Sequence, residues 1–162
     1  MTTHSYFGEL NFDDLCVWEN AINIPQINEN PIEILLWVDD ENTKPTAEFL
    51  DKSAKHFQNI EKLHQKAVIE LVNYLNGDDY FVNYHIDEID EYDLPALTAL
   101  IDNDNLTNEN FVQLLKLQSV SSWYGEHCQI VMDYMIDPEQ SDQILAVKFY
   151  LDGNFNEVSW ES

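Results

Sequence analysis

The apolar residues of this chain change their spacing twice, and this change limits the possible fold more than any other feature of the sequence. From residue 46 to residue 76 they recur every three or four positions, the period of an amphipathic helix. Before and after this segment they alternate with polar residues, as in strands with one buried face. Because strands come first, then helices, then strands again, the sequence predicts an α+β fold with a largely antiparallel sheet.

Three candidate strands precede the helical segment, at residues 6–12, 16–24 and 31–38. The third is the clearest, because every second residue from Ile32 to Val38 is Ile, Leu or Val. Leu35 and Trp37 would lie on its opposite face, so we expect a central strand that is covered on both sides.

A helix over residues 46–76 would begin at Pro45 and Thr46 and end at Gly77, which we expect to take a left-handed conformation. It would be roughly 45 Å long at about 1.5 Å per residue, so we expect a bend or break within it. Four of the lysines, at positions 52, 55, 62 and 66, fall on this segment.

Short helices are predicted between residues 78 and 115, one of them capped by Thr107. Strands are predicted at 116–124, 127–136, 143–151 and 155–160, and Asp152-Gly153 is a typical hairpin turn. We therefore expect one domain over residues 1–162, with the long helix and the short helices packed on one face of a sheet built from both ends of the chain.

The charge of the chain is extreme. It has 31 acidic residues and seven basic ones, which gives a formal net charge of −24, and all seven basic residues are lysines. Nucleic acids and anionic membranes are bound through positive charge, so the sequence argues against both as partners. A basic protein or a divalent cation fits this charge, although acidic surfaces also serve solubility alone.

The two cysteines and the N-terminal residues indicate a cytoplasmic protein. Cys16 and Cys128 lie far apart without a CxxC partner, so they do not form a secreted disulfide framework. The first 12 residues lack the basic and apolar regions of a signal peptide. The longest apolar run, at residues 34–38, is far shorter than the roughly 20 residues of a membrane span.

The opening "YFGEL", the long helical segment and the ending "LAVKFYLDGNFNEVSWES" resemble the uncharacterised bacterial family called domain of unknown function 2004. The resemblance extends over nearly the whole chain and is strongest at its two ends. It implies a compact fold of helices and strands, and it implies no activity, cofactor or site residue.

No catalytic motif emerges, and we predict no cofactor and no assigned metal site. The segment 102–107 begins like a calcium loop but has Leu106 and Thr107 where a ligand and a glycine are needed. His127 and Cys128 are neighbours on a predicted strand and would point to opposite faces. His85, near Asp87 and Glu88, is the best candidate metal ligand or acid–base group, although a solvated acidic helix explains this cluster as well.

Two functional hypotheses remain. The first is a non-enzymatic interaction protein that binds a basic protein, in its most concrete form an immunity-type inhibitor of a cationic toxin. The alternative is a metal-binding domain or metal-dependent hydrolase that uses surface carboxylates and His85. We expect the aromatic residues of the predicted strands to be core, although exposed ones would anchor an interface; they are Trp18, Trp37, Trp123, Tyr124 and Trp160. The predicted partner-binding residues are Asp87, Glu88, Asp90, Glu91 and Asp93.

Overall fold

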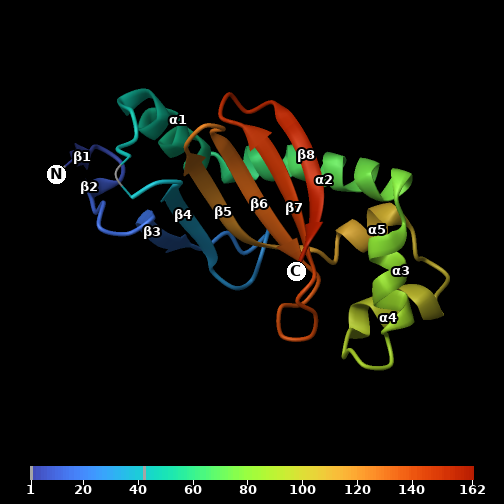
Figure 1. Cartoon of the computed structure of the whole chain (residues 1–162). Helices are drawn as coiled ribbons and strands as arrows, with labels where there is room; N and C mark the ends of the chain where they lie inside the picture. The colour runs from blue at the N-terminus through green and yellow to red at the C-terminus, as the bar shows by residue number, and fades with distance from the viewer. Residues whose placement is uncertain (1, 42) are drawn as a thin grey trace.

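The computed structural model describes residues 2–41 and 43–162, and it has the predicted α+β architecture (Figure 1). The described residues form a six-stranded sheet, a two-stranded sheet and five helices. The strands are β1 (Thr2–His4), β2 (Gly8–Leu10), β3 (Cys16–Ile22), β4 (Ile32–Val38), β5 (Lys116–Tyr124), β6 (Gln129–Met135), β7 (Ile144–Tyr150) and β8 (Phe155–Glu161). The helices are α1 (Ala47–Phe57), α2 (Ile60–Gly77), α3 (Tyr80–Asp87), α4 (Pro95–Asp102) and α5 (Asn108–Val112).

The strands of the large sheet lie in the order β3-β4-β5-β6-β7-β8. All neighbouring pairs are antiparallel except β4 and β5, which are parallel. All five helices occur between β4 and β5 in the chain. A long connection of this kind is what a parallel pair requires, whereas a tight turn can join only antiparallel neighbours. The predicted, largely antiparallel sheet is confirmed.

The helices lie on one side of the large sheet, and the core lies between them and the sheet (Figure 1). One row of this buried face runs from Ile34 through Val120 and Met132 to Val147, each residue paired with the next across neighbouring strands. A polar contact also joins the two layers, because the buried hydroxyl groups of Ser53 on α1 and Ser122 on β5 lie 2.6 Å apart.

The helical segment is divided into α1 and α2 by Gln58 and Asn59, which confirms the expected break. Thr46 caps α1 as predicted, and its hydroxyl group accepts a hydrogen bond of 3.2 Å from the amide of Phe49. The predicted left-handed stop at Gly77 is wrong. Gly77 is the last residue of α2 and has no positive φ, and the chain leaves the helix at Asp78, whose backbone is extended.

The N-terminal region differs from the predicted single strand at 6–12. It forms the small antiparallel sheet of β1 and β2, turning at Gly8 with φ +69°. The side chain of Phe7 is buried at this turn, where its ring packs edge-on against Trp18 of β3 and Phe57 of α1. The small sheet therefore covers the β3 edge of the core.

Candidate partner-binding surface

In the part of the chain that the structure describes, no further layer covers the face of the large sheet opposite the helices, and this face is toward the viewer in Figure 1. We call it the open face. This corrects one expectation, because β4 lies inside the sheet but is covered on one side only. Leu35 and Trp37 lie on the open face and are half-buried, whereas Ile34 and Leu36 are fully buried on the helix side.

Register places the side chains of the open face in rows across the strands. The row at one end joins Trp37, Trp123, Gln129 and Tyr150. The middle row has apolar and small residues at its centre and glutamates at its ends. From β3 to β8 it consists of Glu19, Leu35, Ser121, Val131, Lys148 and Glu157.

Two tryptophans form the aromatic part of the open face. Trp37 and Trp123 are directly paired on the parallel strands β4 and β5. Their rings are stacked, with centroids 5.2 Å apart and planes 10° from parallel. Both side chains are half-buried, so each ring keeps a surface that a partner could cover.

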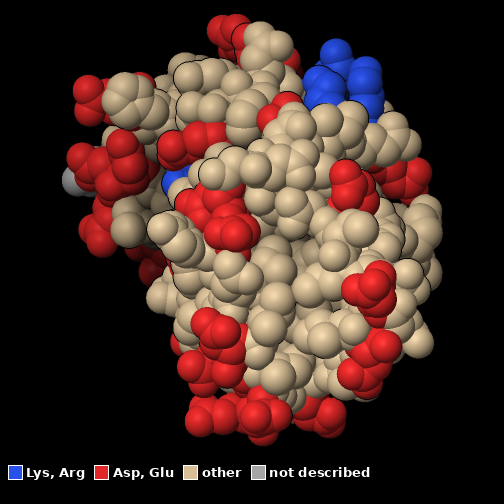
Figure 2. Space-filling view, turned by 90° about the vertical axis from the view of Figure 1, so that its right-hand side faces the viewer, with Lys and Arg blue, Asp and Glu red and all other residues tan. Residues whose placement is uncertain are grey.

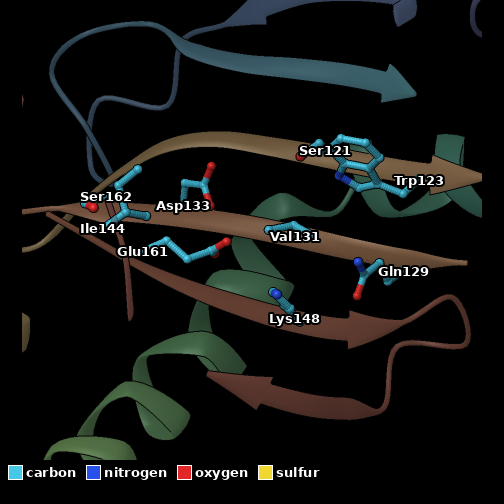
Figure 3. Close-up of a pocket in the computed structure, with 9 residues that line it drawn as sticks. All are labelled: Ser121, Trp123, Gln129, Val131, Asp133, Ile144, Lys148, Glu161 and Ser162. Atoms are coloured by element: carbon cyan, nitrogen blue, oxygen red, sulfur yellow. The ribbon is translucent and has the colours of Figure 1, made fainter. Parts of the chain in front are cut away.

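A shallow hollow of about 350 Å³ lies beside this tryptophan pair, over β5, β6 and β7. Figure 3 shows Trp123 and Gln129 at one end, Val131 and Lys148 in the middle, and Ile144 at the other end. Glu161 and Ser162, at the end of the chain, complete the wall near Ile144. The hollow thus combines an aromatic end with a polar end.

Asp133 gives the hollow a partly buried carboxylate. Burial raises the pKa of Asp133, and the nearby Glu161 raises it further. The hydroxyl group of Ser119 donates a hydrogen bond of 3.3 Å to Asp133, which lowers the pKa, as does the charge of Lys148. Nζ of Lys148 itself lies 3.7 Å from Oε1 of Glu157. A cationic group entering the hollow would add to the positive charge of Lys148 and further favour the ionised form of Asp133.

The predicted partner-binding residues lie together on one segment, the end of α3 and the turn that follows it. Four of them are exposed and Glu88 is half-buried. The backbone amide of Asp93 donates a hydrogen bond of 2.9 Å to the side-chain carbonyl of Gln140. Gln140 belongs to the connection between β6 and β7, which leads directly into Ile144 of the hollow. The acidic segment is therefore joined to one end of the open face.

Charge is distributed unevenly over the surface. Figure 2 shows the side of the molecule where α3 and α4 lie, and acidic side chains gather mainly at its left and lower edges. Basic side chains gather at the upper right of that view, with a further small area at the left. The open face has the same bias: Glu157 and Glu161 lie on β8 beside the strand of Lys148, and Glu19 and Glu33 lie on β3 and β4 at the other edge of the sheet.

His85 is a core residue. Its side chain is fully buried, and both of its ring nitrogens have partners. Nδ1 donates to the carbonyl oxygen of Phe81 at 2.9 Å, and Nε2 lies 2.8 Å from the hydroxyl group of Ser141. Burial lowers the pKa of His85. The structure therefore does not place this imidazole among the surface carboxylates Asp87 and Glu88, where the metal hypothesis needs it.

Within residues 2–41 and 43–162, no three His, Cys, Asp or Glu side chains are positioned to hold a metal ion jointly. In the same part of the chain, no helix combines the length and the low polarity that crossing a membrane requires.

The tryptophan pair is the feature that sequence reasoning missed. The expectation that the strand tryptophans are core is wrong for Trp37 and Trp123, which are half-buried on the open face, and for Trp160, which is 37% exposed on the edge strand β8. Alternation identified the two faces of β4, but only the packing of the helices on one side of the sheet showed which face is left open.

Comparisons with protein-family models, with curated proteins and with solved structures found no match to this chain.

Proposed function

We propose that this chain is a non-enzymatic interaction protein whose open face binds a basic protein partner. The observation that supports this most strongly is the stacked pair of Trp37 and Trp123, which lies uncovered on a sheet face bordered by carboxylates. Tryptophan is among the residues that contribute most to protein–protein binding when a partner desolvates it.

The charge of the chain supports a basic protein as the class of partner. With a net charge of −24, the chain repels nucleic acids and anionic membranes and attracts a basic protein. We assign the acidic segment, Asp87, Glu88, Asp90, Glu91 and Asp93, to the rim of the interface. Rim carboxylates accelerate association and make it dependent on salt, while the desolvated centre of an interface determines how slowly the complex dissociates.

The most concrete form of this proposal is an immunity-type inhibitor, a protein that binds a cationic toxin and blocks it. The resemblance to the domain of unknown function 2004 family implies only a compact fold of helices and strands and adds no activity. A cytoplasmic location is part of the proposal, and the two free cysteines, Cys16 and Cys128, are consistent with a reducing compartment.

A partner captured from the native lysate at low salt, identified by mass spectrometry and purified, allows the central contact to be tested. We expect Trp37→Ala and Trp123→Ala to weaken its binding by about 30-fold each, as a loss of about 2 kcal/mol implies for an interface anchor. Tyr80→Ala is the matched control, because Tyr80 is an aromatic residue that is 70% exposed on α3. Equal affinities of all three variants and the unmodified chain would contradict a binding site on the open face.

The rim is tested separately by converting the five residues of the acidic segment to Asn or Gln. We expect slower association and a weaker dependence of affinity on salt. A control variant removes the same number of negative charges at exposed sites elsewhere, namely Glu9, Asp13, Asp14, Glu29 and Glu41. If both variants changed the association rate to the same extent, net charge rather than this segment would be responsible.

A further inference from the structure

A second hollow, of about 180 Å³, lies on the helix side of the molecule where α1 ends, α2 begins and the β7–β8 hairpin turns. Figure 1 shows the hairpin turn above the sheet, close to the junction of the two helices. Lys55 and His56 from α1, Lys62 and Lys66 from α2, and Gly153 from the hairpin line the hollow. In a chain with seven lysines, three of them thus meet at one place.

These three lysines have no acidic partner at ion-pairing distance in the described part of the chain. By contrast, Lys52 on α1 lies 2.8 Å from Glu48. Asp152 also lines the hollow, but its two carboxylate oxygens accept hydrogen bonds from the backbone and the side chain of Asn154, at 2.9 and 3.0 Å. One carboxylate thus lines the hollow beside three lysines, so the group keeps a net positive charge in a chain with 31 acidic residues.

The folding of the helices does not account for the cluster. Lys55 and His56 occupy the last turn of α1, where positive charge is favourable. Lys62, however, lies in the first turn of α2, where positive charge is unfavourable, and Lys66 follows it by four residues on the same face of the helix. Like charges at this spacing repel each other, so helix stability does not explain why Lys62 and Lys66 lie one turn apart.

The contacts of the hollow leave several N–H groups available to an anion. The Lys66 ammonium group donates one hydrogen bond, of 3.3 Å, to the carbonyl oxygen of Gly153 and retains further donors. His56 is held by Nε2, which donates to the carbonyl oxygen of Leu151 at 2.7 Å. Gly153 has φ +92°, and a Cβ atom added there would lie 3.4 Å from Cε1 of His56. Glycine thus satisfies the turn and keeps this side of the hollow open.

We propose that this hollow binds a phosphate group carrying two or more negative charges. Lysine ammonium groups bind phosphate oxygens as point charges, and three of them match a multiply charged anion. The net charge of the molecule does not prevent this, because at physiological ionic strength exposed charges are largely screened beyond about 8 Å. The ligand is therefore a small phosphorylated molecule or a free phosphate anion, taken up on the side of the sheet opposite the open face.

Inorganic pyrophosphate is the first probe, titrated at constant ionic strength and followed by the backbone amide signal of Gly153 in ¹H–¹⁵N NMR and by calorimetry. We expect saturable binding at one site, and we expect Lys62→Gln and Lys66→Gln each to weaken it by about tenfold, because each removes a charged hydrogen-bond donor. Lys44→Gln is the matched control, since Lys44 precedes the opposite end of α1 and loses the same charge. Lys44, Lys62 and Lys66 are all exposed, so their substitution leaves the core unchanged. Thermal melts of the three variants verify that each one folds.

Two further titrations identify the ligand. Binding of a nucleoside diphosphate more tightly than pyrophosphate would indicate a small molecule that carries the phosphate, whereas equal binding would indicate the free anion. Citrate bound as tightly as pyrophosphate would overturn the assignment to phosphate. An unsaturable response at Gly153, or equal weakening by Lys44→Gln and Lys62→Gln, would overturn the site itself.

Discussion

At the scale of single residues, the structure shows that two histidines, His64 and His85, form hydrogen bonds within the fold. His85 is fully buried with both nitrogens engaged, and Nδ1 of His64 lies 2.8 Å from the hydroxyl group of Tyr134, a buried side chain. Desolvation lowers the pKa of both histidines. Each imidazole is thus neutral near pH 7 and forms its hydrogen bonds within the fold.

The lowered pKa values predict how stability depends on pH. In the unfolded chain, both imidazoles take up a proton near pH 6.5, whereas in the fold they resist protonation until a lower pH. Between these two pH values the unfolded state binds more protons, so the free energy of unfolding should fall as the pH is lowered from about 7.5 to 5.5. Most carboxylates take up protons only below about pH 5.5, so the change in stability over this pH range comes mainly from the histidines.

Urea unfolding at both pH values measures this effect, and the Cε1 proton signal of His85 in NMR reports its pKa directly. A pKa of His85 at or above the ordinary histidine value would show that water or a counter-charge reaches the imidazole, in contradiction to its burial.

At the scale of elements, two glycines at the ends of secondary structure have opposite roles. Gly153 turns the β7–β8 hairpin with φ +92°, a conformation that other residues rarely adopt. Gly77 ends α2 without a positive φ, and a Cβ atom added there would meet nothing within 4 Å. The same substitution should therefore have opposite effects at the two positions.

We expect Gly153→Ala to destabilise the protein by roughly 1 kcal/mol or more, because alanine is strained at positive φ. We expect Gly77→Ala to stabilise it by about 0.5–1 kcal/mol, because alanine reduces the freedom of the unfolded chain. Urea unfolding of both variants and the unmodified protein measures the two changes, each serving as the control for the other. A loss of stability at both positions would contradict the assignment of Gly77 to an unstrained helix end.

At the scale of the whole molecule, repulsion between carboxylates opposes folding. The net charge is −24, and the described residues form few ion pairs: His4 with Asp51, Lys52 with Glu48, and Lys148 with Glu157. Exposed pairs of this kind contribute little. The core between sheet and helices must therefore supply the stability that charge removes.

Salt should consequently stabilise this protein. Raising NaCl from about 0.02 M to about 0.5 M shortens the screening length well below 10 Å and weakens repulsion over the whole surface. We expect the Tm to rise, by about 2–4 °C for each 1 kcal/mol of repulsion relieved in a domain of this size. Scanning calorimetry at a series of salt concentrations measures the change. A Tm that falls with salt would mean that attractive pairs outweigh repulsion.

The spacing of apolar residues by itself determined the α+β class, the strands of the large sheet and the division between helices and strands, but not the small sheet of β1 and β2. Local rules also predicted the Thr46 and Thr107 caps and the Asp152-Gly153 hairpin, each of which the structure confirms. These features depend on neighbours within a few residues, which the sequence displays directly.

Only the tertiary structure decided what lies on each face. Alternation showed that β4 has two apolar faces, but whether a second layer covers Leu35 and Trp37 depends on helices far along the chain. Likewise, nothing in the local sequence shows that the hydroxyl group of Ser141, 56 positions away, lies at hydrogen-bonding distance from Nε2 of His85. Nor does it show that the β7–β8 hairpin turn lies beside lysines from α1 and α2. Such contacts follow from the packing of distant elements, where loop closure and the shape of the core, rather than sequence neighbourhood, determine which side chains meet.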